Sequence, residues 1–208
     1  MNKYDKKKSK KKWIPPPMSA EYLREATTEY LERYMPSTFQ LKQVLWRKID
    51  KNIQMRSSEN RENTENTENT ENRENRSKYE TMVQEELDYR KETGALDDRR
   101  FAEAWVESLH KKGKSKLQIR VKLQQKGIDN SLIQQVLEKR QEDEPDYALS
   151  AAIQYAQKKR LGPFQSDSKK REERYQKDVA AMMRAGHTYD NIKKIMACHT
   201  LDEIAELY

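Results

Sequence analysis

The sequence predicts an all-α protein made of three tandem three-helix repeats of the helix-turn-helix kind, in an elongated arrangement. Its 208 residues include only five glycines and six prolines and are rich in Lys, Glu, Gln, Arg and Ala, which favours helices. Apolar residues recur at spacings of three and four along most of the chain, and no segment alternates convincingly as a strand would.

The third observation is an internal repeat that is centred on two glycines. Six, nine and ten positions after Gly127 and after Gly186 the chain carries apolar residues, and another stands four positions before each glycine. The residues at these positions are Leu123, Ile133, Val136 and Leu137 in one block and Met182, Ile192, Ile195 and Met196 in the other. Each block therefore reads as helix, turn, helix with a longer helix in front, a unit that can stack on its neighbours.

The first bundle is expected over residues 18–95. Ser19 can cap a helix that ends before Pro36, and Ser37 or Thr38 can cap a second helix. A third helix ends near Gly94. Its apolar positions are Tyr79, Met82, Val83 and Leu87, and those of the first two helices are Tyr22, Leu23, Ala26, Tyr30, Leu31, Tyr34, Leu41, Val44, Leu45 and Ile49.

A low-complexity tract at residues 56–77 interrupts this bundle. From Glu59 to Arg76 it consists of six Glu-Asn-x triplets with no apolar residue. The repeat register places the tract between the second and third helices, so we interpret it as a solvated insertion rather than a domain boundary. Lengthening a flexible loop costs only about 0.6 kcal/mol per doubling, so such an insertion is physically tolerable.

The second bundle is expected over residues 96–141, with Asp97 or Asp98, Ser115 and Asp129 opening its helices. Its first helix carries Phe101, Ala102, Trp105, Val106 and Leu109, and its second carries Ile119 and Leu123.

The third bundle, with a C-terminal extension, is expected over residues 142–208. Its first helix starts near Glu144 and Pro145 and breaks at residues 161–163. The apolar positions assigned to its helices and to the extension are Ala148, Leu149, Ala152, Ile153, Ala156, Tyr175, Val179, Met182, Met183, Ile192, Ile195, Met196, Leu201, Ile204 and Leu207.

The N-terminal residues 1–17 read as a disordered basic arm that ends in three prolines. No apolar stretch follows the positive start, as a signal peptide would require, and none approaches the ~18–20 residues of a membrane span. The single cysteine, Cys198, excludes an intramolecular disulfide. We therefore expect a cytoplasmic protein, and the net charge of +7 suggests a polyanionic partner.

The residues give no support for an enzyme or for a bound metal or cofactor. The histidines His110, His187 and His199 lack metal-ligand spacing with Cys198. The string Gly113-Lys114-Ser115 imitates the end of a phosphate-binding loop, but Ser108 stands where that motif needs a glycine. Paired acids such as Asp97 and Asp98 are explained as helix caps.

Positive charge gathers in the second bundle, around its first turn and its middle helix. The candidate partner-binding residues are Arg99, Arg100, Lys111, Lys112, Lys114, Lys116, Arg120, Lys122 and Lys126. An exposed face of this kind could meet phosphates or an acidic protein; the alternative is an ordinary solvated surface. Phe101 and Trp105 are spaced for a core, and Trp13 and Trp46 are weaker candidates for exposed aromatics.

The central segment, residues 94–137, closely resembles the bacterial regulatory protein RecX family. That family shows Gly-x-Leu-Asp-Asp-x-Arg-Phe-Ala, a basic turn with glycine, an Ile-x-x-x-Leu helix and Lys-Gly-Ile. These motifs appear here as residues 94–102, 112–114, Ile119 with Leu123, and residues 126–128. Residues 184–196 are similar to the family's third unit, with His187 where an aromatic is common, so we expect that unit to be less stable.

The resemblance implies three tandem three-helix units and a protein that is not an enzyme. It further implies binding to the RecA recombinase filament on single-stranded DNA, with inhibition of ATP hydrolysis, strand exchange and co-protease activity. Some family members also bind DNA. We expect a monomer that modulates homologous recombination and DNA repair without a cofactor.

Two other interpretations stay open. The same basic helices suit a helix-turn-helix DNA-binding protein without a recombinase partner. The arm and the triplet tract could alternatively make the protein a scaffold that recruits other proteins.

Overall fold

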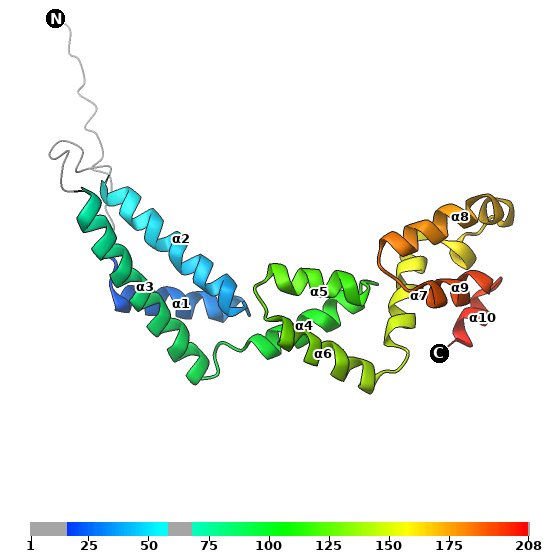
Figure 1. Ribbon diagram of the computed structural model, residues 1–208, viewed down its shortest axis with the longest axis horizontal. Coiled ribbons are helices and arrows are strands. Elements are labelled where there is room, and N and C mark those ends of the chain that lie inside the picture. The colour runs from blue at the N-terminus through cyan, green and yellow to red at the C-terminus, as the bar shows by residue number, and fades with distance from the viewer. Residues whose placement is uncertain (1–15, 58–67, 208) are drawn as a thin grey trace, which may run out of the picture. The chain divides into compact units, whose positions relative to one another are not determined.

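A computed structural model describes residues 16–57 and 68–207, and these form helices and turns with no strand. Figure 1 shows their order. The elements are α1 (Ala20–Arg33), α2 (Thr38–Ser57), α3 (Glu68–Glu92), α4 (Asp98–His110), α5 (Lys116–Gln125), α6 (Asn130–Asp143), α7 (Tyr147–Lys159), the 3-10 turn η2 (Gly162–Phe164), α8 (Ser168–Arg184), α9 (Tyr189–Ala197) and α10 (Leu201–Ala205). The predicted all-α class is confirmed. Residues 1–15 of the predicted arm lie outside the described residues.

The chain divides into two compact parts. The N-terminal part contains the described residues up to Tyr34 together with Leu41–Ala95, and hence α1, most of α2, and α3. The C-terminal part contains Met35–Gln40 and the chain from Leu96 onward. The C-terminal part thus includes both the second and the third predicted bundles, whose individual boundaries stay a prediction.

Most helices begin at the predicted caps because a short polar side chain accepts a bond from a free backbone N–H of the first turn. Ser19 Oγ accepts from Tyr22 N at 3.2 Å, and Ser115 Oγ accepts from Gln118 N at 3.3 Å. Asp97 and Asp129 cap α4 and α6 in the same way. The start predicted near Glu144 is two or three residues early, because Tyr147 N first closes a turn onto the Glu144 carbonyl.

The N-terminal part has a core that includes one carboxylate. Leu23, Leu41, Leu45, Ile49, Val83 and Leu87 are buried. Glu86, however, occupies the apolar position that Val136 fills in the next repeat, and it is also buried. Arg90 Nε donates to Glu86 Oε1 at 2.7 Å, and Arg90 Nη2 donates to the Arg24 carbonyl at 3.0 Å. The buried charge is therefore paired, and the same arginine ties α3 to α1, which α3 crosses in Figure 1.

The triplet tract is only partly a connection between helices. α2 continues to Ser57 and α3 begins at Glu68, so residues 68–77 lengthen α3, which fits the helix propensity of Glu and Arg. At the end of the tract the Arg76 guanidinium lies over the Trp46 ring, 5.2 Å from its centroid, and joins α3 to α2. Residues 58–67 lie outside the described residues.

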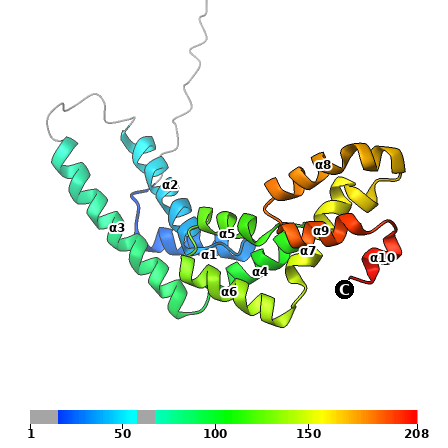
Figure 2. The same ribbon diagram turned by 45° about the vertical axis from the view of Figure 1, so that its right-hand side comes forward.

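The C-terminal part has two hydrophobic cores. The repeat positions predicted from Gly127 and Gly186 are buried in both. One core is formed by α4, α5 and α6 together with Tyr147 at the start of α7, and it includes Phe101, Ile119, Leu123 and Ile133. The other belongs to α7, α8, α9 and α10, which Figure 2 shows gathered near the C-terminus. The equivalent positions of the sequence repeat are thus buried in both cores.

Two residues of α8 differ from the sequence prediction. Tyr175 and Met183 were expected in the core but are 41% and 53% exposed. Met183 lies about 100° around the helix from the buried Met182. Asp178 is buried instead, and its Oδ2 accepts a bond from Gly162 N at 3.1 Å. The core-facing side of α8 therefore holds the η2 turn through a carboxylate rather than through a continuous apolar stripe.

The turn between α4 and α5 fits tightly against α7. Gly113 has φ +70°, and a Cβ built there would stand 2.6 Å from Tyr155 N and 2.9 Å from Tyr155 Cα. With its amide oriented to satisfy both acceptors, Gln154 donates to the carbonyls of His110 at 2.8 Å and Lys111 at 3.0 Å. Ser115 Oγ donates to the Ala185 carbonyl at 2.7 Å. These contacts join the two cores of the C-terminal part.

His187 lies in the same region and is buried. It is 8% exposed, its ring centroid is 5.1 Å from that of Tyr155, and its Nε2 has no hydrogen-bond partner among the described residues. Burial, with a smaller contribution from the positive charge of Lys114, lowers the pKa of His187 to about 4. The imidazole is therefore neutral in the folded protein at pH 7, and protonating it is costly.

We predict that Gly113→Ala is strongly destabilising. The left-handed φ costs a side chain about 1–2 kcal/mol, and the clash with the α7 backbone adds about 1–3 kcal/mol. Gly94→Ala is the matched control, since Gly94 shares φ +70° but has nothing within 4 Å of an added Cβ. Urea unfolding should show a clearly larger loss for Gly113→Ala; equal losses would contradict the described packing.

We also predict that His187 makes stability depend on pH. Its pKa is about 4 when folded, against about 6.5 when unfolded, so the unfolded chain binds more protons between these values. The free energy of unfolding should therefore fall as the pH drops from 6.5 to 4, by at most about 3 kcal/mol. His187→Phe should remove this component and raise stability at pH 5 in thermal melts.

Candidate functional site

The nine predicted basic residues lie in the C-terminal part, on α4, on the α4–α5 turn and on α5 with its C-terminal end. Arg99 and Arg100 open α4, three lysines occupy the α4–α5 turn, and three cations lie on α5, with Lys126 at its end. All nine are at least partly exposed. Their side chains have different surroundings, which separate them into smaller groups.

Some of the nine are already engaged within the protein. The Lys126 ammonium lies over the Trp105 ring, 5.1 Å from its centroid. Lys111 Nζ stands 3.0 Å from Glu107 Oε1, and Arg99 Nη2 donates to Gln135 Oε1 at 2.5 Å. These contacts reduce what the three residues can offer a partner.

The second and third helices of this bundle carry opposite charge. α5 contains Lys116, Arg120 and Lys122 and no acidic residue. α6 contains Glu138, Glu142 and Asp143 against Lys139 and Arg140, so it is acidic by one charge. A partner that meets this bundle therefore finds a basic helix beside an acidic one.

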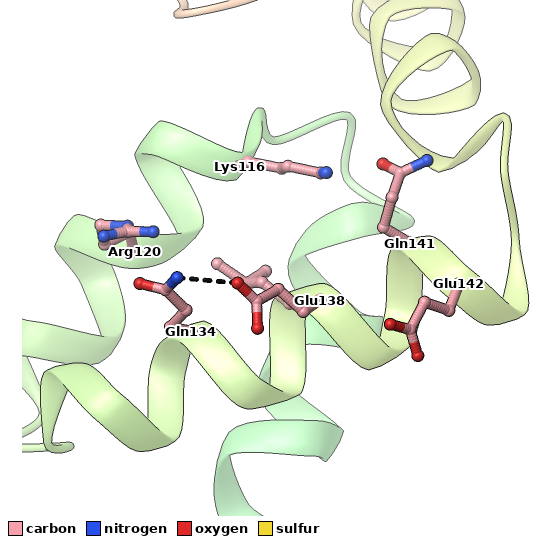
Figure 3. A pocket seen from close by; sticks show the side chains of 7 residues that line it. Lys116, Arg120, Gln134, Glu138, Gln141 and Glu142 are labelled. Carbon is pink, nitrogen blue, oxygen red and sulfur yellow. Dashed lines mark hydrogen bonds between the residues drawn. The ribbon is translucent and has the colours of Figure 1, made fainter.

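A hollow of about 300 Å³ lies between these two helices (Figure 3). Lys116 and Arg120 of α5 face α6 across it, and the Lys116 side chain extends toward Gln141. The lining from α6 is Gln134, Leu137, Glu138, Gln141 and Glu142. The hollow thus has a cationic wall and a wall that carries carboxylates.

The two walls are not joined by ion pairs among the described residues. Gln134 Nε2 donates to Glu138 Oε1 at 2.7 Å, within α6. On the opposite wall, burial lowers the pKa of Lys116 below its usual value. A carboxylate placed beside Lys116 would offset that desolvation, so this wall suits an acidic group of a partner.

α5 also exposes apolar side chains that the sequence analysis did not select. Leu117 is 60% exposed and Val121 is 42% exposed, four residues apart on one face. Ile119 and Leu123 supply the core stripe of α5, so the other two apolar residues fall outside it. A ten-residue helix with two apolar residues outside its core stripe was the sequence signal that could have identified this exposed surface. Together with the neighbouring cations, these two side chains give α5 a surface that is both apolar and charged.

A second hollow joins two segments that are distant in sequence. Lys111 and Lys112 of the α4–α5 turn line it together with Gln154, Gln157 and Lys158 of α7. Lys158 is not among the nine predicted basic residues. It comes close to Lys111 and Lys112 only because the α4–α5 turn packs on α7.

Other chemistry finds little support in the described part of the chain. It contains no group of three or more His, Cys, Asp or Glu residues that could hold a metal ion. Cys198 is buried, and burial raises the pKa of its thiol, while His199 beside it is exposed. None of the described helices is long and apolar enough to cross a membrane.

Comparison with known proteins shows which proteins this chain resembles. Residues 97–137, which span α4 to α6, match the second three-helix domain of RecX. A regulatory protein RecX of Myxococcus xanthus (strain DK1622) is 31% identical over 193 residues, which cover 92% of this chain and 93% of the relative. One from Agrobacterium fabrum (strain C58 / ATCC 33970) is 33% identical over 106 residues, which cover 51% of this chain and 54% of that protein.

Two crystal structures share the fold. A regulatory protein RecX aligns with a TM-score of 0.52 at 18% identity, over 85% of this chain and 70% of the other. RecX from Lactobacillus salivarius aligns with a TM-score of 0.51 at 14% identity, over 85% of this chain and 94% of the other. The match in sequence over nearly the full length of a relative, together with the matching second domain, leads to one conclusion: the chain belongs to the RecX family of regulatory proteins.

Proposed function

We propose that this protein binds the RecA recombinase filament on single-stranded DNA and inhibits its ATP hydrolysis, strand exchange and co-protease activity. Membership of the RecX family supports this role, because it is the one that the family resemblance implies. The protein then acts by contact with its partner and not as an enzyme. Its effect is to modulate homologous recombination and DNA repair.

The observation that carries the proposal is the surface of α5. It combines exposed Leu117 and Val121 with the cations Lys116 and Arg120, beside a hollow that is large enough for a partner's side chain. Apolar anchors surrounded by charge are what a protein interface uses: the anchors supply affinity and the charges supply orientation. An acidic surface on a protein filament would complement this helix.

The charge of α6 argues against the rival interpretation, a helix-turn-helix protein that reads duplex DNA. In such proteins the last helix of the motif lies in the major groove. Here the last helix, α6, carries one more acid than base, and Glu138 and Glu142 line the hollow on its surface. Phosphates on both sides of the groove would repel those carboxylates.

The proposal predicts inhibition of the recombinase. Added below the molar amount of RecA, the protein should lower the rate of single-stranded-DNA-dependent ATP hydrolysis, since contacts that repeat along a filament reinforce each other. A coupled ATPase assay measures this. Absence of inhibition at every molar ratio would falsify the proposal.

The basic residues around α5 should contribute to that inhibition. We expect the variant K114A/K116A/R120A/K122A to need about tenfold more protein for half-inhibition, from four contacts at partly or fully exposed positions of about 0.3–0.5 kcal/mol each. Circular dichroism should show unchanged helicity. The matched control K139A/K169A/K177A/K193A removes four exposed charges outside α5 and should inhibit normally. If both variants lose inhibition equally, only net charge matters and the assignment to α5 is wrong.

The rival makes its own prediction about duplex DNA. A dedicated duplex reader would bind tightly at physiological salt, with log affinity falling by about 0.9 per phosphate contact for each log unit of salt. We expect instead an affinity no tighter than nonspecific association, with Kd of about 10⁻⁴–10⁻⁶ M. Fluorescence anisotropy over a salt series separates the two outcomes.

A further inference from the structure

We propose that the hollow between the α4–α5 turn and α7 is a binding site for backbone phosphates of nucleic acid, separate from the α5 surface. Its lining residues are Lys111, Lys112, Gln154, Gln157 and Lys158, and we call it the lysine cradle. The site does not depend on the proposed action on RecA, because its ligand is the nucleic acid itself.

The charge in the cradle has one sign. Three of the five lining residues are lysines and none is acidic. Lys111 is partly neutralised by Glu107, at 3.0 Å. Lys112 and Lys158 are exposed and have no ion pair within 4 Å in the described part of the chain. Two like charges held at one hollow repel each other, and a bound anion would relieve that repulsion.

The chemistry of the lining favours phosphate over an acidic protein. No apolar or aromatic side chain lines the cradle, although protein interfaces depend on such anchors. Lysine binds phosphate as a point charge, and Lys112 and Lys158 present two such charges at the hollow. The α5 surface, with Leu117 and Val121, has the opposite character.

The cradle is preformed. Gly113 lies against the backbone of Tyr155, and Gln154 donates to the His110 and Lys111 carbonyls. The two carbonyls at the end of α4 are thus already satisfied and need not face an anion. The backbone that carries Lys112 is thereby fixed against the helix that carries Lys158, so the two positions are set before a ligand arrives and less ordering is needed on binding.

The cradle is a shallow surface hollow. Its volume is about 320 Å³ and it is open to solvent, so a ligand group can rest in it while the rest of the ligand stays outside. With a polar and charged lining it offers nothing for a base to stack on. A backbone phosphate with its base directed outward fits these properties, so recognition should be independent of base sequence.

The test compares K112Q/K158Q with the matched control K177Q/K193Q, which removes two exposed lysines of α8 and α9. Binding of the full chain to a fluorescein-labelled dT oligonucleotide is followed by anisotropy from 50 to 300 mM NaCl. The cradle variant should bind roughly tenfold more weakly at 0.1 M salt, and the slope of log affinity against log salt should shrink by about 1.4, two contacts at about 0.7 each.

Further arms identify the anion. Duplex DNA of equal length should show a parallel loss if the ligand is phosphate in general, and mixed-sequence oligonucleotides should behave like dT. Poly-glutamate should compete much less well than an equal charge concentration of tripolyphosphate. If it competes equally, the cradle is an acidic-protein site and the proposal is overturned.

Two results on the variants decide the location. Equal binding by the cradle variant and its control overturns the proposal, with far-UV circular dichroism confirming that both fold. The RecA ATPase assay on the same variants separates the two proposals. If K112Q/K158Q loses DNA binding but still inhibits RecA, the cradle is an independent site. If it binds DNA normally but no longer inhibits RecA, the cradle proposal is overturned, and the proposal for the α5 surface is unaffected.

Discussion

The C-terminal part depends on glycine turns that let one helical unit approach the backbone or side chains of its neighbour. Gly113 leaves space for the backbone of Tyr155, and Gly186 leaves space for Ser115 and Leu117. All these turns have positive φ, where a side chain would be strained even without a neighbour. The same residue that reverses the chain therefore also provides the close contact, and the hollow lined by Lys112 and Lys158 lies beside the contact of Gly113.

Local features of the sequence predicted the helices well. Caps such as Ser19, Asp97 and Ser115 act through bonds within one turn, so a few consecutive residues suffice to recognise them. The buried repeat positions were equally legible because helical periodicity is local. Glu86 was not predicted as a core residue, since its partner Arg90 makes a buried carboxylate acceptable only once α3 packs on α1.

The candidate site was harder to predict. The density of charge along the chain selected nine cations, but it does not show which of them are already engaged. Lys126 lies over the Trp105 ring, whereas Lys112 has no ion pair in the described residues. Lys158 lies near Lys112 only because the α4–α5 turn packs on α7, and helical periodicity in the sequence does not predict such a long-range contact. Leu117 and Val121 were passed over because an apolar residue in a helix is ordinarily assigned to the core.

The opposite signs of α5 and α6 have a kinetic consequence. A basic helix beside an acidic one gives this bundle a directional field at distances where no contact has formed. An anionic partner is attracted by one helix and repelled by the other, so encounters are oriented before the surfaces touch. Added salt should accordingly slow association far more than it speeds dissociation, because screening weakens the long-range field but does not act on uncharged side chains such as the exposed Leu117 and Val121.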